Sequence, residues 1–295
     1  MDFLNYFFIY LIVLFFGLAV GSFLKCLLDR LERNEKLNGR SNCPNCGHVL
    51  IWKDLIPIFS FLFLGGKCRY CRKKISFQYP LAEISTALIF IMILNFKIGI
   101  LNHFEFFNLL NAIDLLFLFY IASSLIVIFI YDIKFYLIPD RIIFPAIIVA
   151  IIYRIFNFIL YNFSELYQKS SFLFTSTNGG LEVWIFLPLI NYIFAAMIAS
   201  GFFLSIFLIS KGRWMGFGDV KLALLLGLLL GFPNILCGIF LAFLFGAIIG
   251  LGLIILEKKG LKSQMPFAPF LIIGTFLSMF WGENIIQWYI KTIMF

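Results

Sequence analysis

The run LLNAIDLLFLFYIASSLIVIFIYD, residues 109–132, decides the class of fold. A helix needs about 20 apolar residues to cross a hydrocarbon core of about 30 Å, and residues 109–131 contain a single charged side chain, Asp114. Similar apolar runs flank this one on both sides, at residues 3–24, 81–101, 142–161, 183–209, 222–230, 235–256 and 266–290. The sequence therefore predicts an all-α polytopic membrane protein with about eight transmembrane helices, of which the sixth is short.

The composition of the whole chain excludes other classes of protein. Of its 295 residues, 62% are hydrophobic and 13% are charged, whereas soluble proteins average about 25% charged residues. Low charge with high hydrophobicity is also the reverse of what disordered chains have. The first apolar run has no basic residue before it and Lys25 directly after it, unlike a cleaved signal peptide. We therefore expect a retained first helix with the N-terminus outside.

Most of the formal net charge of +8 lies in one polar segment. Residues 25–78 carry 11 Lys and Arg against 4 Asp and Glu. Because basic loops mark the cytoplasmic side of a membrane protein, this excess indicates topology rather than nucleic-acid binding. Alternation from an outside N-terminus puts four segments in the cytoplasm, and they hold 19 of the 23 basic residues: 25–80, 132–141, 210–221 and 257–265.

Four of the six cysteines form two pairs, Cys43-Pro44-Asn45-Cys46 and Cys68-Arg69-Tyr70-Cys71. Two residues between the members of each pair let both thiolates bind one ion, and two such pairs complete a tetrahedral zinc site. Disulfides are the alternative, but they do not persist in the cytoplasm. Four protein ligands leave no open position, which favours a structural metal. The sequence predicts a small cytoplasmic four-Cys zinc-binding domain between the first and second helices, with the ligands Cys43, Cys46, Cys68 and Cys71.

Ionisable residues within or at the ends of membrane spans are candidates for function, because their burial is costly. Glu83, Asp114 and Arg154 lie within spans, and for them pairing or snorkelling to the interface is the simpler interpretation. Asp132 closes the third span and Asp219 opens the sixth, both at the cytoplasmic end. The topology therefore predicts that these two carboxylates lie at the same depth on the same face.

Two carboxylates close together in a partly dry site share one proton. Such a pair can activate a water molecule and protonate a leaving amine, as aspartic peptide hydrolysis requires. Gly216 and Gly218 precede Asp219 and give a mobile backbone that an extended peptide could approach closely. Two alternatives stay open at this point: Asp219 as a helix N-cap, and Asp132 as a plain interfacial residue.

Several segments, taken in order from about residue 17 to residue 270, resemble the type IV prepilin peptidases. These are membrane aspartic peptidases that mature pilin-like precursors and the pseudopilins of type II secretion. The matching stretches are Gly21-Ser22-Phe23-Leu24, the two Cys pairs, Trp52-Lys53-Asp54-Leu55-Ile56-Pro57, Gly66-Lys67-Cys68-Arg69, Ile75-Ser76 with Tyr79-Pro80 and Glu83, Asp132 with Ile138-Pro139-Asp140, Gly216-x-Gly218-Asp219-x-Lys221-Leu222, and Pro266-Phe267-Ala268-Pro269-Phe270.

The resemblance implies that Asp132 and Asp219 are the catalytic pair and that Gly216 and Gly218 form the flexible active-site turn. The implied substrate is a prepilin or pseudopilin precursor with a short basic leader ending in Gly, followed by a hydrophobic helix. Cleavage is implied at the cytoplasmic face of the inner membrane, the side that the charge distribution also indicates.

Many members of this family also methylate the new N-terminal residue with S-adenosylmethionine, and those members carry the four-Cys domain. Gly66 and Lys67 lie in the stretch that the family associates with this second activity. Three departures weaken the methyltransferase inference and leave the peptidase pair intact. Lys25-Cys26 stands where the family usually has Asn-Val, Leu55 replaces an Asn, and Gln78 replaces an Arg.

The chain is predicted to divide into a first transmembrane helix (1–24), a cytoplasmic zinc-binding domain (25–79) and a membrane-embedded aspartic peptidase domain (80–295). Because basic loops repel a basic leader, nearby acids or lipid headgroups are expected to help receive it, unless those acids are salt-bridge partners. The acids are Asp29, Glu32, Glu35 and Asp54.

Two rival functions stay in view. A proton-coupled membrane transporter predicts ionisable residues deep in several spans along a path, whereas the acids of interest here cluster at one face. A noncatalytic zinc scaffold of secretion machinery keeps the metal but needs no pair of acids. Neither reading involves nucleic acid.

Overall fold

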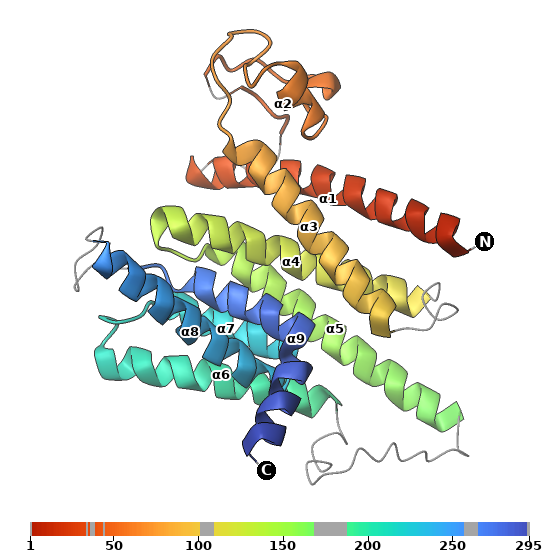
Figure 1. The fold of residues 1–295 in the computed structure, drawn as a ribbon, viewed down its shortest axis with the longest axis vertical. Coiled ribbons are helices and arrows are strands. Elements are labelled where there is room, and N and C mark those ends of the chain that lie inside the picture. Colours follow the sequence, from red (N-terminus) through yellow and green to blue (C-terminus); the bar gives the residue numbers. More distant parts are fainter. Residues whose placement is uncertain are drawn as a thin grey trace. The chain divides into compact units, whose positions relative to one another are not determined.

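The structure is a computed structural model that describes residues 2–33, 35, 39–43, 45–100, 109–167, 188–256 and 265–293. Helices account for nearly all of its regular structure (Figure 1). In chain order they are α1 (Asp2–Glu32), the 3₁₀ helix η1 (Trp52–Asp54), α2 (Phe59–Phe63), α3 (Gln78–Ile100), α4 (Leu109–Phe135), α5 (Asp140–Tyr167), α6 (Pro188–Ser210), α7 (Phe217–Leu230), α8 (Asn234–Ile255) and α9 (Ala268–Ile293).

The expectation of an all-α polytopic membrane protein is confirmed. Among the described residues, seven helices are long and apolar enough to cross a membrane: α1, α3, α4, α5, α6, α8 and α9. The sixth predicted span is α7, which begins at Phe217 rather than at Leu222 and has 14 residues. At 1.5 Å per residue α7 is about 21 Å long, less than a bilayer core of about 30 Å. The predicted count of about eight therefore resolves into seven long helices and one that is too short to cross alone.

The chain forms two compact units, residues 1–127 and 128–295, and each is described by itself. In the first unit α1 packs closely against α3 (Figure 1). A Cβ atom at Gly17 would lie 2.6 Å from the Cα of Ala87, and one at Gly21 would lie 2.6 Å from the Cα of Glu83. Small residues four apart thus let the two backbones approach, as in many membrane helix pairs.

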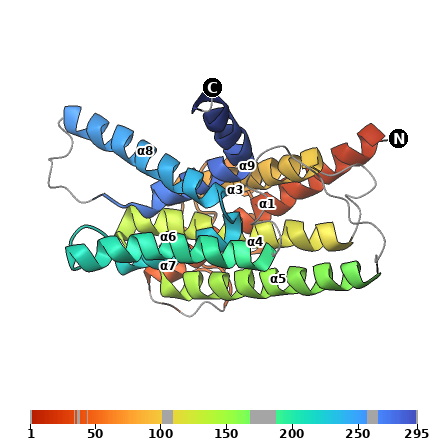
Figure 2. The same cartoon turned by 90° about the horizontal axis from the view of Figure 1, so that it is seen from below.

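In the second unit α7 packs along α6 and also contacts α5, while α8 packs against α9 (Figure 2). A Cβ atom at Gly227 of α7 would lie 2.6 Å from the backbone nitrogen of Ala196 of α6. Leu222, Leu225 and Leu226 of α7 are at most 1% exposed. The shortest of these membrane helices is therefore also deeply buried, and its position is set by contacts along its whole length.

The four-Cys segment lies between α1 and α3, the first and second membrane helices, as the sequence predicted. It contains η1, α2 and two isolated antiparallel β-bridges, Asn42–Val49 and Lys67–Lys74. Each bridge closes a turn that carries one pair of cysteines. Most of the predicted cytoplasmic segment 257–265 lies outside the described residues.

Candidate active site and metal centre

Asp132 lies in the last turn of α4 and is 5% exposed. The backbone N–H of Ala268, the first residue of α9, donates a hydrogen bond to its carboxylate. The first N–H groups of a helix have no partner inside the helix, and the helix dipole favours negative charge there. The motif at residues 266–270 therefore acts on Asp132 by placing a helix N-terminus against it.

Asp219 is the third residue of α7 and is half-buried. Gly216 is the N-cap residue, with φ −78° and ψ 154°, and its N–H donates a hydrogen bond to the Asp219 carboxylate. An acid at this position that reaches back to the N-cap N–H is one half of a capping box. The alternative of Asp219 as the N-cap is therefore wrong, because the cap is Gly216 and Asp219 lies inside the first turn.

Asp132 and Asp219 lie close enough in the second unit for their carboxylates to interact electrostatically. The two acids come from different helices, and each accepts a hydrogen bond from a helix-start N–H group. Two carboxylates at close range repel each other when both are ionised, so ionising the second acid costs more than ionising the first. Chemically, the arrangement offers a base and an acid side by side.

The two glycines before Asp219 have different surroundings. A Cβ atom at Gly218 would lie 3.1 Å from the Cβ of Ile138, in the short connection between α4 and α5. A Cβ atom at Gly216 would have no neighbour closer than 3.9 Å, and that neighbour is Oδ2 of Asp219 itself. Gly218 thus allows close packing beside the acids, and Gly216 leaves space at the carboxylate.

An ion pair joins the start of α7 to the start of α5. The Nζ of Lys221 lies 2.6 Å from Oδ1 of Asp140, and it also lies 4.8 Å from the ring centroid of Phe144. Asp140 is the first residue of α5, where an acid is favourable because of the helix dipole. Asp140 and Lys221 belong to two separate motifs of the sequence, and the sequence did not predict their contact.

Arg154 of α5 binds the C-terminal end of α7, well away from Asp219 in the chain. Its Nε donates to the carbonyl oxygen of Leu228 at 2.8 Å, and one terminal nitrogen donates to that of Leu229 at 2.8 Å. The guanidinium carbon lies 3.4 Å from the ring centroid of Tyr192. The last carbonyls of a helix lack partners inside the helix, so Arg154 satisfies those of a helix that ends within the membrane-spanning part of the chain. The simpler interpretation of Arg154, pairing, is the one that the structure bears out.

The four predicted zinc ligands come together. Their sulfur atoms all lie within 4.8 Å of one another, and the Cys43 and Cys71 sulfurs are 3.9 Å apart. In a tetrahedral site with Zn–S bonds of about 2.3 Å, the sulfurs stand about 3.8 Å apart. Burial opposes ionisation of Cys43, but N–H groups of Asn45 and Cys46 outweigh it and lower its pKa to about 7. The cluster therefore fits a Zn²⁺ ion in both spacing and chemistry.

The two halves of this cluster repeat one turn. In the first, the N–H of Cys43 bonds to the carbonyl of His48, and Gly47 has φ +68°. In the second, the N–H of Cys68 bonds to the carbonyl of Lys73, and Arg72 has φ +57°. The left-handed residue after each pair turns the chain so that both sulfurs point to one centre.

Gly66 and Lys67, associated by resemblance with methylation, lie where α2 joins the second turn. Gly66 has φ +67°, its N–H donates to the carbonyl of Phe61 at 2.9 Å, and a Cβ atom there would press on the Phe61 ring at 3.2 Å. Lys67 is exposed and forms the bridge with Lys74. These contacts give both residues a local structural role, and their association with methylation stays a prediction.

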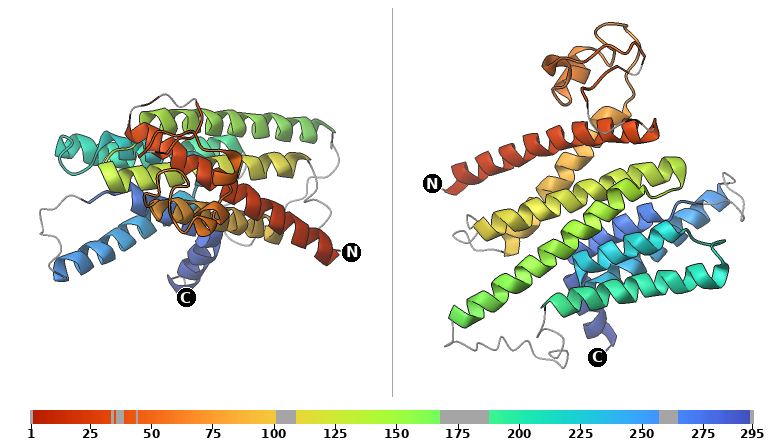
Figure 3. Two further views of the ribbon diagram at one scale, coloured as in Figure 1. Left: turned by 90° about the horizontal axis from the view of Figure 1, so that it is seen from above. Right: turned by 180° about the vertical axis from the view of Figure 1, so that it is seen from behind.

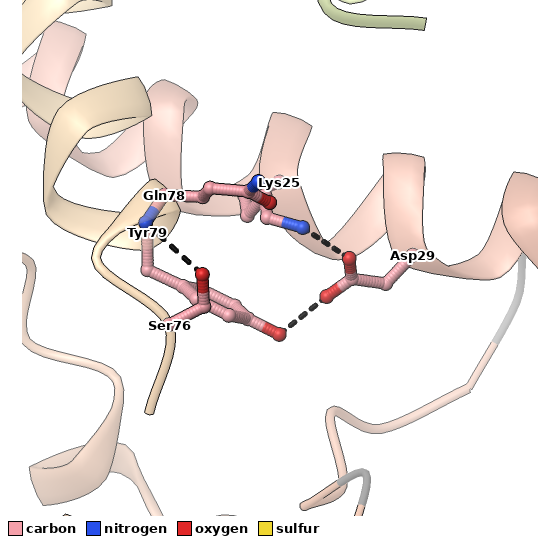
Figure 4. Close-up of polar contacts among 5 residues, drawn as sticks. All are labelled: Lys25, Asp29, Ser76, Gln78 and Tyr79. Atoms are coloured by element: carbon pink, nitrogen blue, oxygen red, sulfur yellow. Dashed lines mark hydrogen bonds and ion pairs between the residues drawn. The ribbon is translucent and has the colours of Figure 1, made fainter. Parts of the chain in front are cut away.

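A partly buried polar cluster at the junction of α1 and α3 contains two of the departures from the family pattern (Figure 4). Lys25, 4% exposed, donates to Asp29, and the hydroxyl of Tyr79 donates to the same carboxylate. The Nζ of Lys25 also lies 4.8 Å from the Tyr79 ring centroid. The N–H of Gln78, another departure, donates to Ser76 at the start of α3.

The acids expected to receive a basic leader have partners within the chain. Asp29 binds Lys25 and Tyr79, and Asp54 binds Arg69 at 2.7 Å. Glu35 lies 3.8 Å from Arg33. Among the described residues, these contacts favour the alternative of salt-bridge partners.

Comparison with known proteins identifies the family. Residues 15–96 match the bacterial peptidase A24 N-terminal domain, and residues 117–251 match the type IV leader peptidase family. The chain is 31% identical over 281 residues to the prepilin leader peptidase/N-methyltransferase of Bacillus subtilis, covering 95% of this chain and 97% of that protein. The protein of the same name from Pseudomonas aeruginosa is 30% identical, with 93% and 91% covered. That of Legionella pneumophila is 29% identical, with 97% and 96% covered. No solved structure gives a significant match.

Proposed function

The chain belongs to the type IV leader peptidase family, and we propose that it is a membrane aspartic endopeptidase that removes the short basic leader from prepilin or pseudopilin precursors. The observation that carries this proposal is the meeting of Asp132 and Asp219, from two helices, at electrostatic range. Family membership supplies the substrate class, and the two carboxylates supply the chemistry.

In the proposed reaction the pair holds one proton, and the ionised carboxylate takes a second proton from water. The water oxygen adds to the scissile carbonyl carbon while the protonated carboxylic acid gives its proton to the carbonyl oxygen. The C–N bond then breaks, the leaving nitrogen takes a proton from one aspartic acid, and the new carboxyl group returns its hydroxyl proton to the pair. Because the two acids titrate as a unit, the roles of base and acid belong to the pair.

The surrounding backbone suits this role. The N–H groups of Ala268 and Gly216 each donate to one carboxylate and hold it in a fixed orientation. Gly216 and Gly218 form the proposed active-site turn, and the absence of a side chain at Gly216 leaves room at Asp219 for a peptide backbone. A prepositioned acid pair costs less reorganisation during reaction than a mobile one.

We also propose that Cys43, Cys46, Cys68 and Cys71 bind one structural Zn²⁺ ion. When bound, zinc supplies a covalent cross-link to a segment that has a small apolar core, and four thiolates leave it no open position for chemistry. The division into a first helix (1–24), zinc-binding domain (25–79) and peptidase domain (80–295) is proposed on the same grounds.

The proposed location is the inner membrane, with the N-terminus outside and the acid pair at the cytoplasmic face. The concentration of basic residues in alternate loops supports this orientation. Asp132 at the end of α4 and Asp219 at the start of α7 would then meet a precursor whose basic leader remains in the cytoplasm.

A second activity, N-methylation of the new N-terminus with S-adenosylmethionine, is proposed from the double name of the relatives. The four-Cys segment with Gly66 and Lys67 is its proposed location. Mass spectrometry of a cleaved precursor, incubated with and without S-adenosylmethionine, reads the cleavage site and a methyl group together. Absence of the methyl group from fully cleaved product would remove the second activity and leave the first.

The peptidase proposal is tested by changing Asp132→Asn and Asp219→Asn separately and assaying a purified precursor in detergent. Each variant is expected to lose cleavage while it keeps its zinc and its thermal unfolding transition. Asp114→Asn is the matched control, because it removes an acid from the same helix as Asp132 but one that pairs with Lys97 at 3.2 Å. Full cleavage by either folded active-site variant would reject the two-aspartate mechanism.

The cleavage assay, together with a separate measurement in sealed vesicles, distinguishes the rival functions. A noncatalytic scaffold shows no cleavage with any variant, and a proton-coupled transporter responds to a pH gradient across vesicles without cleaving a precursor.

A further inference from the structure

The four-Cys segment contains an apolar stretch that a water-exposed domain would not carry. Residues 55–64 read LIPIFSFLFL, with Ser60 as the one polar side chain. Three side chains of α2 point outward: Phe59 is 46% exposed, Leu62 is 66% exposed and Phe63 is 86% exposed. Contiguous exposed apolar side chains of this size mark a surface that contacts a membrane or another protein.

A partly buried hydrogen bond places the start of this stretch beside α3. The N–H of Ile58, the N-cap residue of α2, donates to Oε2 of Glu83 at 2.7 Å. Glu83 is 6% exposed and lies inside the candidate membrane span Gln78–Gly99 rather than before it. The start of α2 is therefore at the level of a residue within the span.

The ring of Phe61 strengthens this placement. It lies 6.2 Å from the ring of Phe77, which directly precedes α3. Figure 1 and the right view of Figure 3 show α2 in the loop segment above α1, on the side where α3 starts. These two contacts tie α2 to the start of α3, the second candidate membrane span.

Charge indicates which partner covers the exposed face. Residues 53–74 alone carry six exposed basic side chains: Lys53, Lys67, Arg69, Arg72, Lys73 and Lys74. Trp52, in the 3₁₀ helix next to α2, is 70% exposed, and aromatic rings of this kind collect at the level of lipid headgroups. Basic side chains beside an apolar helix surface are complementary to anionic lipid headgroups above acyl chains.

We propose that α2 is an interfacial membrane anchor, whose Phe59, Leu62 and Phe63 side chains enter the acyl region of an anionic bilayer. The four-Cys segment is then held on the membrane surface by its own helix and does not extend as a domain into water. This anchor is independent of the peptidase activity, since it uses neither Asp132 nor Asp219.

The test places a photoreactive phenylalanine analogue at position 63, and separately at position 62, of the full chain in nanodiscs containing phosphatidylglycerol. After irradiation, mass spectrometry identifies what each probe has captured. The control carries the analogue at position 45, an exposed residue of the first Cys turn. Cleavage activity and zinc content are measured on each variant to verify that it is folded. The conclusion itself rests only on the amount of lipid adduct.

We expect at least tenfold more lipid adduct at positions 62 and 63 than at position 45. Equal lipid adduct at all three positions, or capture of other segments of this chain at 62 and 63, would overturn the proposal. Repeating the irradiation with a precursor that resists cleavage tests whether the surface of α2 binds lipid or substrate. Transfer of the adduct from lipid to the precursor would show that this surface binds substrate, and lipid capture that persists supports the anchor.

Discussion

Replacing Arg154 with Met tests whether the buried end of α7 controls the acid at its other end. The substitution keeps a long apolar side chain but removes both hydrogen bonds to the carbonyls of Leu228 and Leu229. It also removes the stacking on Tyr192. The last carbonyls of a helix have no partner inside it, so these two hydrogen bonds satisfy carbonyls that α7 itself leaves unpaired.

The magnitude follows from these contacts. Hydrogen bonds to a charged group contribute about 1.5–3 kcal/mol each, so the loss of two costs about 3–6 kcal/mol. Removing a cation from the middle of a span returns about 2.5–3.5 kcal/mol. With both contributions taken at the middle of their ranges, the net destabilisation of α7 in its observed position is about 1.5 kcal/mol, which shifts the equilibrium toward displaced positions about tenfold.

Cleavage of a purified precursor is measured as kcat and KM, together with the thermal unfolding transition. We expect kcat to fall and KM to change little, because Asp219 moves with α7 while the surfaces that hold the precursor remain. Arg154→Lys should be intermediate, since one ammonium group cannot reproduce the planar fork that reaches two carbonyls. Lys97→Met is the matched control, because it removes a cation of α3 that pairs with Asp114 in the first unit.

The reasoning is refuted if Arg154→Met keeps both the unfolding temperature and kcat of the unchanged protein. An equal fall in kcat in Lys97→Met would also refute the reasoning, because the loss of any membrane cation would then have the same effect.

Smaller perturbations test other contacts of the site. Gly218→Ala should destabilise the protein by about 1–3 kcal/mol in denaturation, because its Cβ would lie 3.1 Å from Ile138, and truncating Ile138 should restore stability. Gly216→Ala should leave the unfolding temperature unchanged, since no neighbour lies within 3.9 Å; an equal loss from both would contradict the packing argument. Cys43→Ser should reduce bound zinc from about one ion per chain, measured by plasma emission, and unaltered zinc would exclude this ligand. Lys221→Met should cost at most about 1 kcal/mol, because its ion pair is partly exposed, and a larger loss would mean that the pair positions α5 and α7.

Much of the architecture could be predicted because the signals are local. Long apolar runs predict membrane helices, and all seven long helices coincide with predicted runs. The spacing of the two Cys pairs predicts one metal centre, and the four sulfurs do meet within 4.8 Å. Asp132 and Asp219 could be paired from topology, because helix ends on one side of a membrane share a depth.

Other features could not be predicted because they depend on contacts between distant residues. Nothing near Arg154 in the sequence indicates that it binds carbonyls of Leu228 and Leu229. Likewise, nothing in the sequence around Glu83 indicates that its carboxylate accepts a hydrogen bond from the N–H of Ile58. Asp29 was expected to bind the basic leader, but its carboxylate already accepts hydrogen bonds from Lys25 and Tyr79.

The sequence by itself determined the membrane class, the approximate spans, the metal-binding residue types and the two acids at helix ends. These properties follow from hydropathy and residue spacing, which are written along the chain. Only the tertiary structure decided that Gly216, not Asp219, caps α7 and that Arg154 closes its buried end. The physical reason is that a buried backbone group must find a partner wherever the fold brings one, and that partner can lie anywhere in the chain.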